Sequence, residues 1–248
     1  MTAHRVSATN KPEHVQAECD GGDLDCGSGL LLIIRNHMLP LNSNDVLLVK
    51  SRENSVKEDL PAWCRMVKHK MMHVEDVGNN HTHYFIAKKG DDAELTKDLE
   101  TAKNFKWKTR LKWNGGMKAT AYTRNHSFVV GQSASFDTED EAPSAIEYLI
   151  SALAGCLLVG FQWRLSQKNI EIYNLEITLH AEVDNILFFL GVQNVGHSGV
   201  NKITGQLYVD ADEELSTLQT VWQETLERSP VANTLINKTE LKIEMRQT

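Results

Sequence analysis

The sequence contains few cysteines and few prolines, four and five respectively among 248 residues. The cysteines are Cys19, Cys26, Cys64 and Cys156, and they form no C-x-x-C pair and no zinc-ligand spacing. This pattern excludes the usual structural zinc sites, and we expect neither a metal nor another cofactor. In a cytoplasmic protein the thiols are reduced, so each cysteine is either a core residue or a reactive thiol.

Positive charge is also scarce, because 26 lysines and arginines stand against 33 aspartates and glutamates, for a formal net charge of -7. Nucleic-acid binding needs a clustered basic surface, so that function is excluded. Residues 1–18 are polar and lack the apolar segment of a signal peptide. The longest apolar stretch, Leu149 to Phe161, is too short to span a bilayer. We therefore expect a cytoplasmic protein without a nucleic-acid or membrane partner.

Hydrophobic periodicity and turn residues divide the chain into two domains of the α+β class. Residues 1–17 are predicted to be a flexible arm. Residues 18–90 are predicted to form a small β-α-β-α-β-β domain, a two-layer sandwich with helices on one face of the sheet. Residues 91–107 are charged and poor in large apolar side chains, which predicts a linker. Residues 108–248 form the second domain.

The second domain is predicted to begin with three strands, of which the first two are joined by a hairpin signal at Asn114-Gly115. A long helix, two strands, an amphipathic helix, a short helix and a last strand follow. In the first domain the predicted helices cover 30–39 and 55–63, and the strands lie before Cys26 and over 46–49, 71–75 and 84–87. In the second domain the predicted elements cover 108–113, 117–123, 127–132, 143–168, 171–183, 203–209, 213–228, 230–237 and 240–246.

The predicted helix 143–168 is apolar on nearly every face of its middle part, Tyr148 to Phe161. Such a helix has no side that water solvates well, so it must be buried all round. Its own sheet covers one part, and we expect a second copy of the chain to cover the rest. The sequence therefore predicts a homodimer formed around a long central buried helix.

The segment from Ala142 to Leu158, A-P-S-A-I-E-Y-L-I-S-A-L-A-G-C-L-L, resembles the central helix of the OsmC/Ohr family. The later Ser229-Pro230-Val231 stands where that family has Cys-Pro-Val before its last strand. The resemblance covers about residues 108–248 and implies an OsmC-like α+β domain that forms an intertwined homodimer. It also implies a peroxidase in which one thiolate attacks a hydroperoxide and a second cysteine resolves the sulfenic acid.

The resemblance assigns three residues, each with a plainer alternative. Cys156 falls on the attacking cysteine, but a cysteine on an apolar helix is also a common small core residue. Glu147 falls on the glutamate that positions the thiol, but an acid in the first helical turn also stabilises the helix dipole. Ser229 replaces the resolving cysteine, and it equally fits the N-cap of the short helix that follows.

The family's arginine, which stabilises the thiolate, has no clear counterpart. The two places where the family carries it are occupied here by Met117 and by Ser135-Phe136. Arg124 is the nearest alternative cation, and no motif places it. The set of residues implied by the peroxidases is therefore half present.

Residues 59–64, D-L-P-A-W-C, followed by His69, resemble the D-I-P-x-F/W-C…H signature of TusA/SirA-like proteins. Upstream, residues 24–29, L-D-C-G-S-G, stand where that family has Leu-Asp and Cys-Pro-x-Pro. The resemblance covers the first domain and implies a sulfur carrier, in which Cys26 would hold a persulfide at a helix N-terminus. Both prolines are glycine here, and an alignment without gaps would place Leu31 at the cysteine position instead.

Three functions stay open. The first is an OsmC-like thiol-redox protein that handles a hydroperoxide or sulfur-bearing small molecule, with Cys156, Glu147, Arg124 and Cys26 as candidate catalytic residues. The second is a non-catalytic OsmC-like protein that binds a small molecule. The third is a sulfur-relay carrier in which Cys26 alone is chemically active. The first and third imply peroxidase-like or sulfurtransferase-like activity, with a small-molecule or thiol substrate.

Overall fold

The fold is known from a computed structural model, which describes residues 11–89, 92–131, 142–237 and 239–247. The chain separates into two compact units. The N-terminal unit runs to Lys106 and includes Leu165–Asn169, and the C-terminal unit comprises Trp107–Arg164 and the residues from Ile170 onward.

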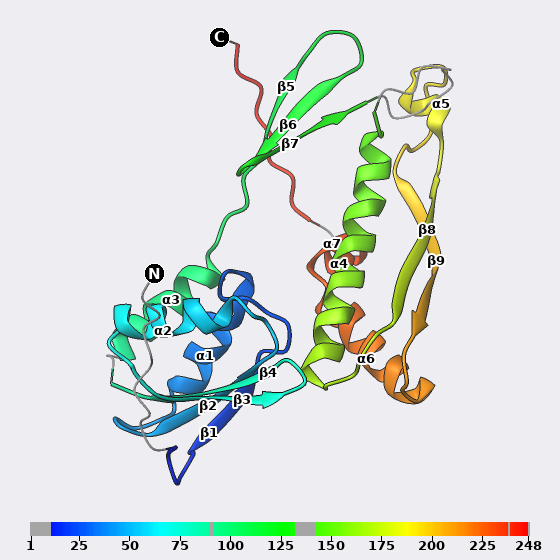
Figure 1. Ribbon diagram of the computed structural model, residues 1–248. Helices are drawn as coiled ribbons and strands as arrows, with labels where there is room; N and C mark the ends of the chain where they lie inside the picture. Colours follow the sequence, from blue (N-terminus) through cyan, green and yellow to red (C-terminus); the bar gives the residue numbers. More distant parts are fainter. Residues whose placement is uncertain (1–10, 90–91, 132–141, 238, 248) are drawn as a thin grey trace, which may run out of the picture. The chain divides into compact units, whose positions relative to one another are not determined.

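The N-terminal unit is a four-stranded sheet with its helices on one side (Figure 1). The strand order is β1-β2-β4-β3, with β1 parallel to β2 and the other pairs antiparallel. The structure thus has the predicted β-α-β-α-β-β order in two layers, followed by one additional helix. The elements are β1 (Ala17–Asp20), a π-helical turn η1 (Cys26–Leu30), α1 (Leu31–Met38), β2 (Val46–Ser51), α2 (Val56–Met66), β3 (Lys70–Gly78), β4 (His81–Ala87) and α3 (Asp92–Lys103).

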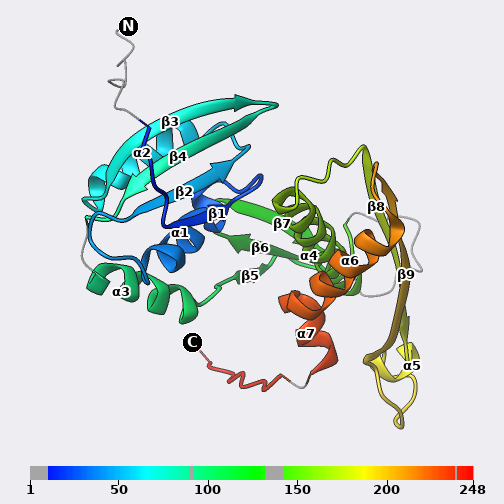
Figure 2. The same ribbon diagram turned by 90° about the horizontal axis from the view of Figure 1, so that it is seen from below.

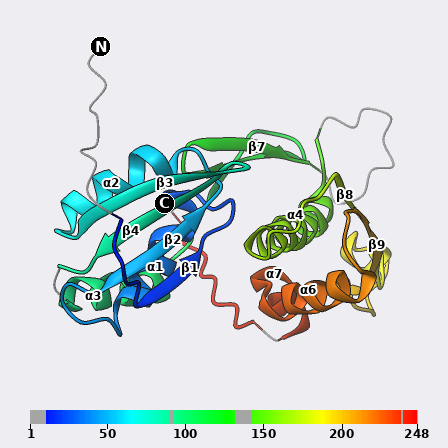
Figure 3. The same cartoon turned by 60° about the horizontal axis from the view of Figure 1, so that its bottom comes forward.

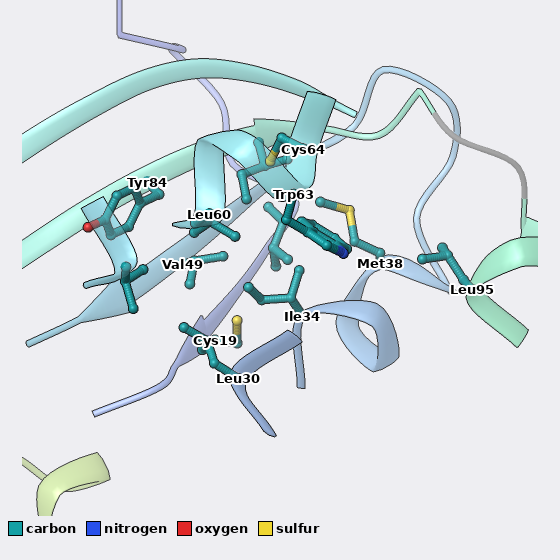
Figure 4. Close-up of a cluster of buried hydrophobic side chains, with 13 residues drawn as sticks. Cys19, Leu30, Ile34, Met38, Val49, Leu60, Trp63, Cys64, Tyr84 and Leu95 are labelled. Carbon is teal, nitrogen blue, oxygen red and sulfur yellow. The ribbon is translucent and has the colours of Figure 1, made fainter. Parts of the chain in front are cut away.

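Helix α3 corrects the prediction of a linker over residues 91–107. Its Leu95 is only 2% exposed and belongs to the main hydrophobic core, beside Met38 and Trp63 (Figure 4). Three residues further along the same face of the helix, Asp98 forms a 2.9 Å ion pair with Arg35 of α1. The segment looks like a linker in sequence because most of its other side chains are polar. The buried leucine and the ion pair with Arg35 attach it to the core and to α1.

A buried lysine connects the end of α1 to the start of α3. Lys88 is 4% exposed, and its Nζ donates hydrogen bonds to the carbonyl oxygens of Leu39, at 3.2 Å, and Leu41, at 2.6 Å. It also forms a 2.5 Å ion pair with Asp92 in the first turn of α3. All three ammonium protons therefore have a partner, which is the condition under which a lysine is tolerated inside a protein.

Residues 11–17 of the predicted flexible arm are attached to the sheet. Gln16 exchanges hydrogen bonds with Val46, through its backbone nitrogen at 3.0 Å and its side-chain oxygen at 2.7 Å. Lys11 forms a 2.6 Å ion pair with Glu75 of β3. Residues 11–16 therefore extend the attachment of β1 to the sheet. The remainder of the arm, residues 1–10, lies outside the described residues.

The C-terminal unit contains one long helix, two small sheets and further helices. Sheet β5-β6-β7 and hairpin β8-β9 are separate, and α4 runs beside α6 and α7 (Figures 1 and 3). The elements are β5 (Arg110–Trp113), β6 (Ala119–Thr123), β7 (His126–Val130), α4 (Ala145–Gln167), β8 (Asn174–Val183), α5 (Ile186–Phe189), β9 (Val200–Asp210), α6 (Leu215–Arg228) and α7 (Pro230–Ile236). Of these, the short helix α5 was not predicted.

Helix α4 is buried on only one side by the described part of the chain. Leu153, Leu157 and Phe161 are buried, whereas Val159 is 65% exposed. The predicted all-round burial is therefore not reached within one chain. By length and composition alone, the 23-residue helix could also cross a membrane, which the expectation from the shorter run 149–161 did not anticipate.

The last predicted strand, residues 240–246, is absent from the described chain. Residues 239–247 have no strand pairing, and Leu241, Ile243 and Met245 are all at least 80% exposed. These three side chains alternate as in a strand with one apolar face. A strand also needs a pairing partner, and this segment pairs with none of the strands in the described part of the chain. The prediction of a strand here is wrong for one copy of the chain.

Candidate functional site

The predicted thiol of α4 lies against the residue at the start of α7. Cys156 is partly buried, and its Sγ lies 3.2 Å from the Oγ of Ser229, which is 4% exposed. The two residues are 73 positions apart in sequence. The structure therefore brings together the cysteine and the serine that the sequence placed at the attacking and resolving positions.

The position of Ser229 is determined by its role as a helix cap. It is the N-cap of α7, its Oγ accepts a hydrogen bond from the backbone nitrogen of Ala232 at 3.2 Å, and Pro230 follows at the first helical position. This agrees with the predicted N-cap. Because the oxygen already accepts from the backbone, its own proton is available to the sulfur of Cys156. A hydroxyl donating to a thiolate is a charge-assisted hydrogen bond.

A cation that the sequence analysis did not select lies on the same helix as Cys156. Arg164, in the last turn of α4, is 8% exposed. Its Nη1 donates a 2.9 Å hydrogen bond to the carbonyl oxygen of Gly160, and its Nε lies 3.8 Å from Oε1 of Glu224 on α6. Arg164 follows Cys156 by eight residues, two steps of four, and this spacing is the sequence signal that could have placed both side chains on one face of the helix.

Glu147 forms a capping box instead of contacting the thiol. Its Oε2 accepts a 2.6 Å hydrogen bond from the backbone nitrogen of Ser144, and its own nitrogen donates to the Oγ of Ser144 at 3.2 Å. Hydrogen bonding of the carboxylate first to the backbone nitrogen and then to the side chain of Ser144 holds the pKa of Glu147 below its usual value. Nine residues separate it from Cys156, about 13.5 Å along a helix. Within one chain the structure does not bring the two together.

The candidate cation Arg124 lies in the turn between β6 and β7, where it is exposed and has a φ of 50°. The structure joins it by hydrogen bond or ion pair to neither Cys156 nor Glu147. Of the two places where the family carries its arginine, Met117 is 69% exposed in the loop after β5. Ser135 and Phe136 lie outside the described residues.

An apolar cavity of about 490 Å³ adjoins the thiol site. Leu153 and Leu157, on either side of Cys156 in sequence, line it from α4, and Ala232 lines it from α7. The other walls come from β8, β9 and α6, with Trp222 among the largest side chains. Cys156 itself does not line the cavity. The space is suited to the hydrocarbon part of a small molecule.

Cys26 lies at the start of η1, as predicted, but its surroundings do not favour a thiolate. Burial, followed by the charges of Asp59 and Asp25, raises its pKa to about 11. Asp25 also caps the turn, because its Oδ1 accepts a 2.6 Å hydrogen bond from the nitrogen of Ser28. A carboxylate thus occupies the site where the turn would otherwise stabilise an anionic sulfur.

The other two cysteines are core residues. Cys19 and Cys64 are 6% and 1% exposed and pack in the main core of the N-terminal unit (Figure 4). Burial is the main cause that raises the pKa of each thiol to about 12. Both are therefore protonated at neutral pH and shielded from reagents.

Comparisons with known proteins show which family the region containing Cys156 and Ser229 is similar to. Residues 138–244 match the family described as OsmC-like protein. No curated protein matches the chain. An OsmC-like protein from Mycoplasma pneumoniae is similar in structure, with 17% identity, coverage of 54% of this chain and 90% of that chain, and a TM-score of 0.47.

Two further solved structures are similar over about the same share of this chain, with lower identity and TM-score. An OsmC-like protein of unknown function from Vibrio cholerae has 12% identity, covers 55% of this chain and 96% of that chain, and has a TM-score of 0.44. An OsmC-like hydroperoxide resistance protein from a Jannaschia species has 12% identity, covers 55% of this chain and 89% of that chain, and has a TM-score of 0.37.

Proposed function

Because residues 138–244 are an OsmC-like domain, we propose that the protein is a thiol-dependent redox protein that reduces organic hydroperoxides through Cys156. The observation that carries the proposal is the 3.2 Å contact between Cys156 Sγ and Ser229 Oγ. It places next to the sulfur, in a partly buried place, a hydroxyl that can donate a hydrogen bond to it. A hydroxyl there stabilises a thiolate, and the thiolate is the nucleophilic form.

The proposed reaction has two stages. The Cys156 thiolate attacks one peroxide oxygen, the O–O bond breaks, and the alkoxide leaves and takes up a proton to become an alcohol. The sulfur, oxidised by two electrons, becomes a sulfenic acid. A thiol from solution then forms a mixed disulfide with Cys156 and releases water. A second thiol regenerates the Cys156 thiol and leaves as a disulfide with the first.

The external thiol is needed because Ser229 has no sulfur. It occupies the position from which a cysteine would close a disulfide with Cys156. Cys19 and Cys64 are buried in the core of the N-terminal unit, and the raised pKa of each keeps it protonated. We therefore include a small-molecule or protein thiol as the second substrate.

The cavity beside the thiol supports an organic substrate. Its walls are mainly aliphatic and aromatic side chains, among them Leu153, Leu157 and Trp222. Hydrogen peroxide would gain nothing from such a surface, whereas a hydroperoxide with a hydrocarbon group would bury apolar area there. The same cavity would serve the alternative function, a non-catalytic OsmC-like protein that binds a small apolar molecule.

We propose a homodimer through the OsmC-like domain. Within the described chain, α4 leaves Val159 exposed on the side opposite its core, and sheet β5-β6-β7 exposes Trp113 and Leu111. The extended segment 239–247 has an apolar face and no strand partner. A second copy would supply both a cover for α4 and an edge for this segment. The four free cysteines support a cytoplasmic location, where thiols stay reduced.

The sulfur-carrier function proposed from the TusA/SirA-like resemblance is the weaker candidate. The N-terminal unit has the matching order of helices and strands, and Cys26 lies at the first turn. However, burial and two carboxylates raise the pKa of Cys26 to about 11, so almost none of it is thiolate at neutral pH. We therefore assign the primary chemistry to Cys156.

Single-turnover oxidation tests the proposal. The full chain is treated with one equivalent of cumene hydroperoxide, and sulfenic acid is trapped with dimedone and located by mass spectrometry. We expect dimedone on Cys156 in the wild type and in Cys26→Ser, and none on the C-terminal unit of Cys156→Ser. With excess dithiothreitol, the wild type should consume peroxide repeatedly. Labelling at Cys26 alone would favour the sulfur carrier, and labelling at neither would favour the binding protein.

A further inference from the structure

A row of residues along α4 faces the end of α6 and the start of α7. Cys156, Gly160 and Arg164 are spaced by four, so they lie on one side of the helix. Opposite them, Ser229 contacts Cys156, and Glu224 pairs with Arg164. Between these two contacts, Gly160 is packed against α6. The thiol and the buried cation thus both face the interface of α4 with α6 and α7, and Figure 3 shows these three helices side by side.

The arginine side chain points along the helix toward the thiol. Its Nη1 donates to the carbonyl oxygen of Gly160, one turn closer to Cys156. A Cβ at Gly160 would lie 3.3 Å from this nitrogen and 3.5 Å from Cγ2 of Thr225. The first distance is tighter than ordinary van der Waals contact. The glycine therefore keeps open the space into which the guanidinium folds.

The charge of Arg164 is only partly neutralised by its ion pair. Glu224 is 39% exposed, lies 3.8 Å from Nε of Arg164, and also pairs with Arg228 at 3.3 Å. Nε makes no hydrogen bond to any described residue. One half-exposed carboxylate is thus shared by two cations, and a buried guanidinium is stable when further negative charge is near.

The other elements around this site add little charge. Helix α7, Pro230–Ile236, has no charged residue. On β8, Glu176, His180 and Glu182 are on the exposed side of the alternating pattern. Lys202 of β9 pairs with Glu182 at 3.2 Å. The charges next to Arg164 are therefore those of Glu224, Arg228 and an ionised Cys156.

We propose that Arg164 supplies the positive charge that stabilises the thiolate of Cys156. It is a positioning residue on the same helix, and it takes the role of the arginine that the family pattern has elsewhere and this sequence lacks. This rests on the proposed reactivity of Cys156. Burial lowers the pKa of the Arg164 guanidinium, Glu224 raises it, Arg228 lowers it, and an ionised Cys156 raises it. An ionised Cys156 therefore favours the charged form of Arg164.

The test is the pH dependence of Cys156 alkylation by iodoacetamide, a neutral reagent, followed by peptide mass spectrometry on the full chain. In Arg164→Gln we expect alkylation at pH 7 to slow about tenfold, the effect of removing one nearby opposite charge. At about pH 10, where a thiol ionises without help, the rates of variant and wild type should converge. Arg164→Lys should recover most of the rate at pH 7.

Glu224→Gln is the matched variant, and its expected effect on the alkylation rate is the opposite of that of Arg164→Gln. The position is half-exposed and tolerates substitution. It removes the carboxylate that competes for the guanidinium, so Cys156 alkylation at pH 7 should become faster. Equal slowing of Arg164→Gln at every pH, or an unchanged profile in both variants, would overturn the role of Arg164. If the profiles shift as expected but no peroxide is consumed, the inference stands and the proposed peroxidase function fails.

Discussion

Replacing Ser229 by cysteine should create a disulfide with Cys156. The present Sγ to Oγ distance of 3.2 Å brings the two side-chain ends close enough for a small adjustment to form an S–S bond. The bond would close a loop of 73 residues. Chain entropy for such a loop predicts about 4 kcal/mol of stabilisation of the C-terminal unit in the oxidised variant. This corresponds to a rise in melting temperature on the order of 10 °C.

In its reduced form, Ser229→Cys should be less stable than the wild type. Serine caps α7 through its hydrogen bond to Ala232, and cysteine is a poor cap, so Ser229→Cys should lose about 1 kcal/mol when dithiothreitol is present. Thermal unfolding with and without reductant measures both effects on one sample. Intact mass should fall by two hydrogens on oxidation, and digestion should yield a peptide pair joining positions 156 and 229.

The control is Ser229→Cys in a Cys156→Ser background, which should show the loss of the cap and no response to oxidant. Ser229→Ala measures the cap alone. If the variant folds but forms no disulfide with Cys156, then the two residues are not neighbours in solution. In that case both the site and the explanation of the absent second thiol are wrong. A rapid intrachain disulfide at Cys156 in the wild type would contradict the same reasoning.

Three further outcomes are expected. Glu147→Gln should cost about 0.5 kcal/mol at pH 7; because the pKa of Glu147 is lowered in the fold, its contribution is complete above the usual glutamate pKa of about 4.3 and is lost as pH falls through the lowered pKa, where thermal melts of variant and wild type should converge. Leu95→Ala should destabilise the N-terminal unit by about 2–4 kcal/mol in urea, whereas the exposed Lys97→Ala should not. Light scattering at micromolar concentration should give about twice the 27.9 kDa chain mass, and removal of residues 239–248 should lower it; a monomeric wild type would refute the dimer.

The sequence predicted elements well where local chemistry determines them. Asn114-Gly115 marked the β5–β6 turn, and Ser229-Pro230 marked the start of α7, because caps and turns depend on a few adjacent residues. The linker was wrong because the attachment of α3 depends on Leu95 and on an ion pair with Arg35, two contacts made at long range. Such contacts produce no recognisable pattern in the sequence of the helix.

The candidate site was predicted only in part, because some of its contacts are likewise made at long range. Cys156 and Ser229 were selected together, and the structure places them in contact. Arg164 was missed because a cation in the last turn of a helix has an ordinary explanation in the helix dipole. Its burial depends on the missing side chain at Gly160 and on the packing of α6. The prediction of a last strand was wrong because alternating side chains indicate an apolar face but provide no pairing partner, and residues 239–247 pair with no strand in the described part of the chain.

The buried ammonium of Lys88 can be used to measure local opening of the N-terminal unit. Acylating reagents attack only a neutral amine that solvent can reach, and Lys88 has hydrogen bonds to Leu39 and Leu41 and an ion pair with Asp92. Lys89, the next residue, is exposed and gives a reference rate in the same peptide. The ratio of the two acylation rates therefore measures how often α3 detaches from α1, without a mutation or an attached dye.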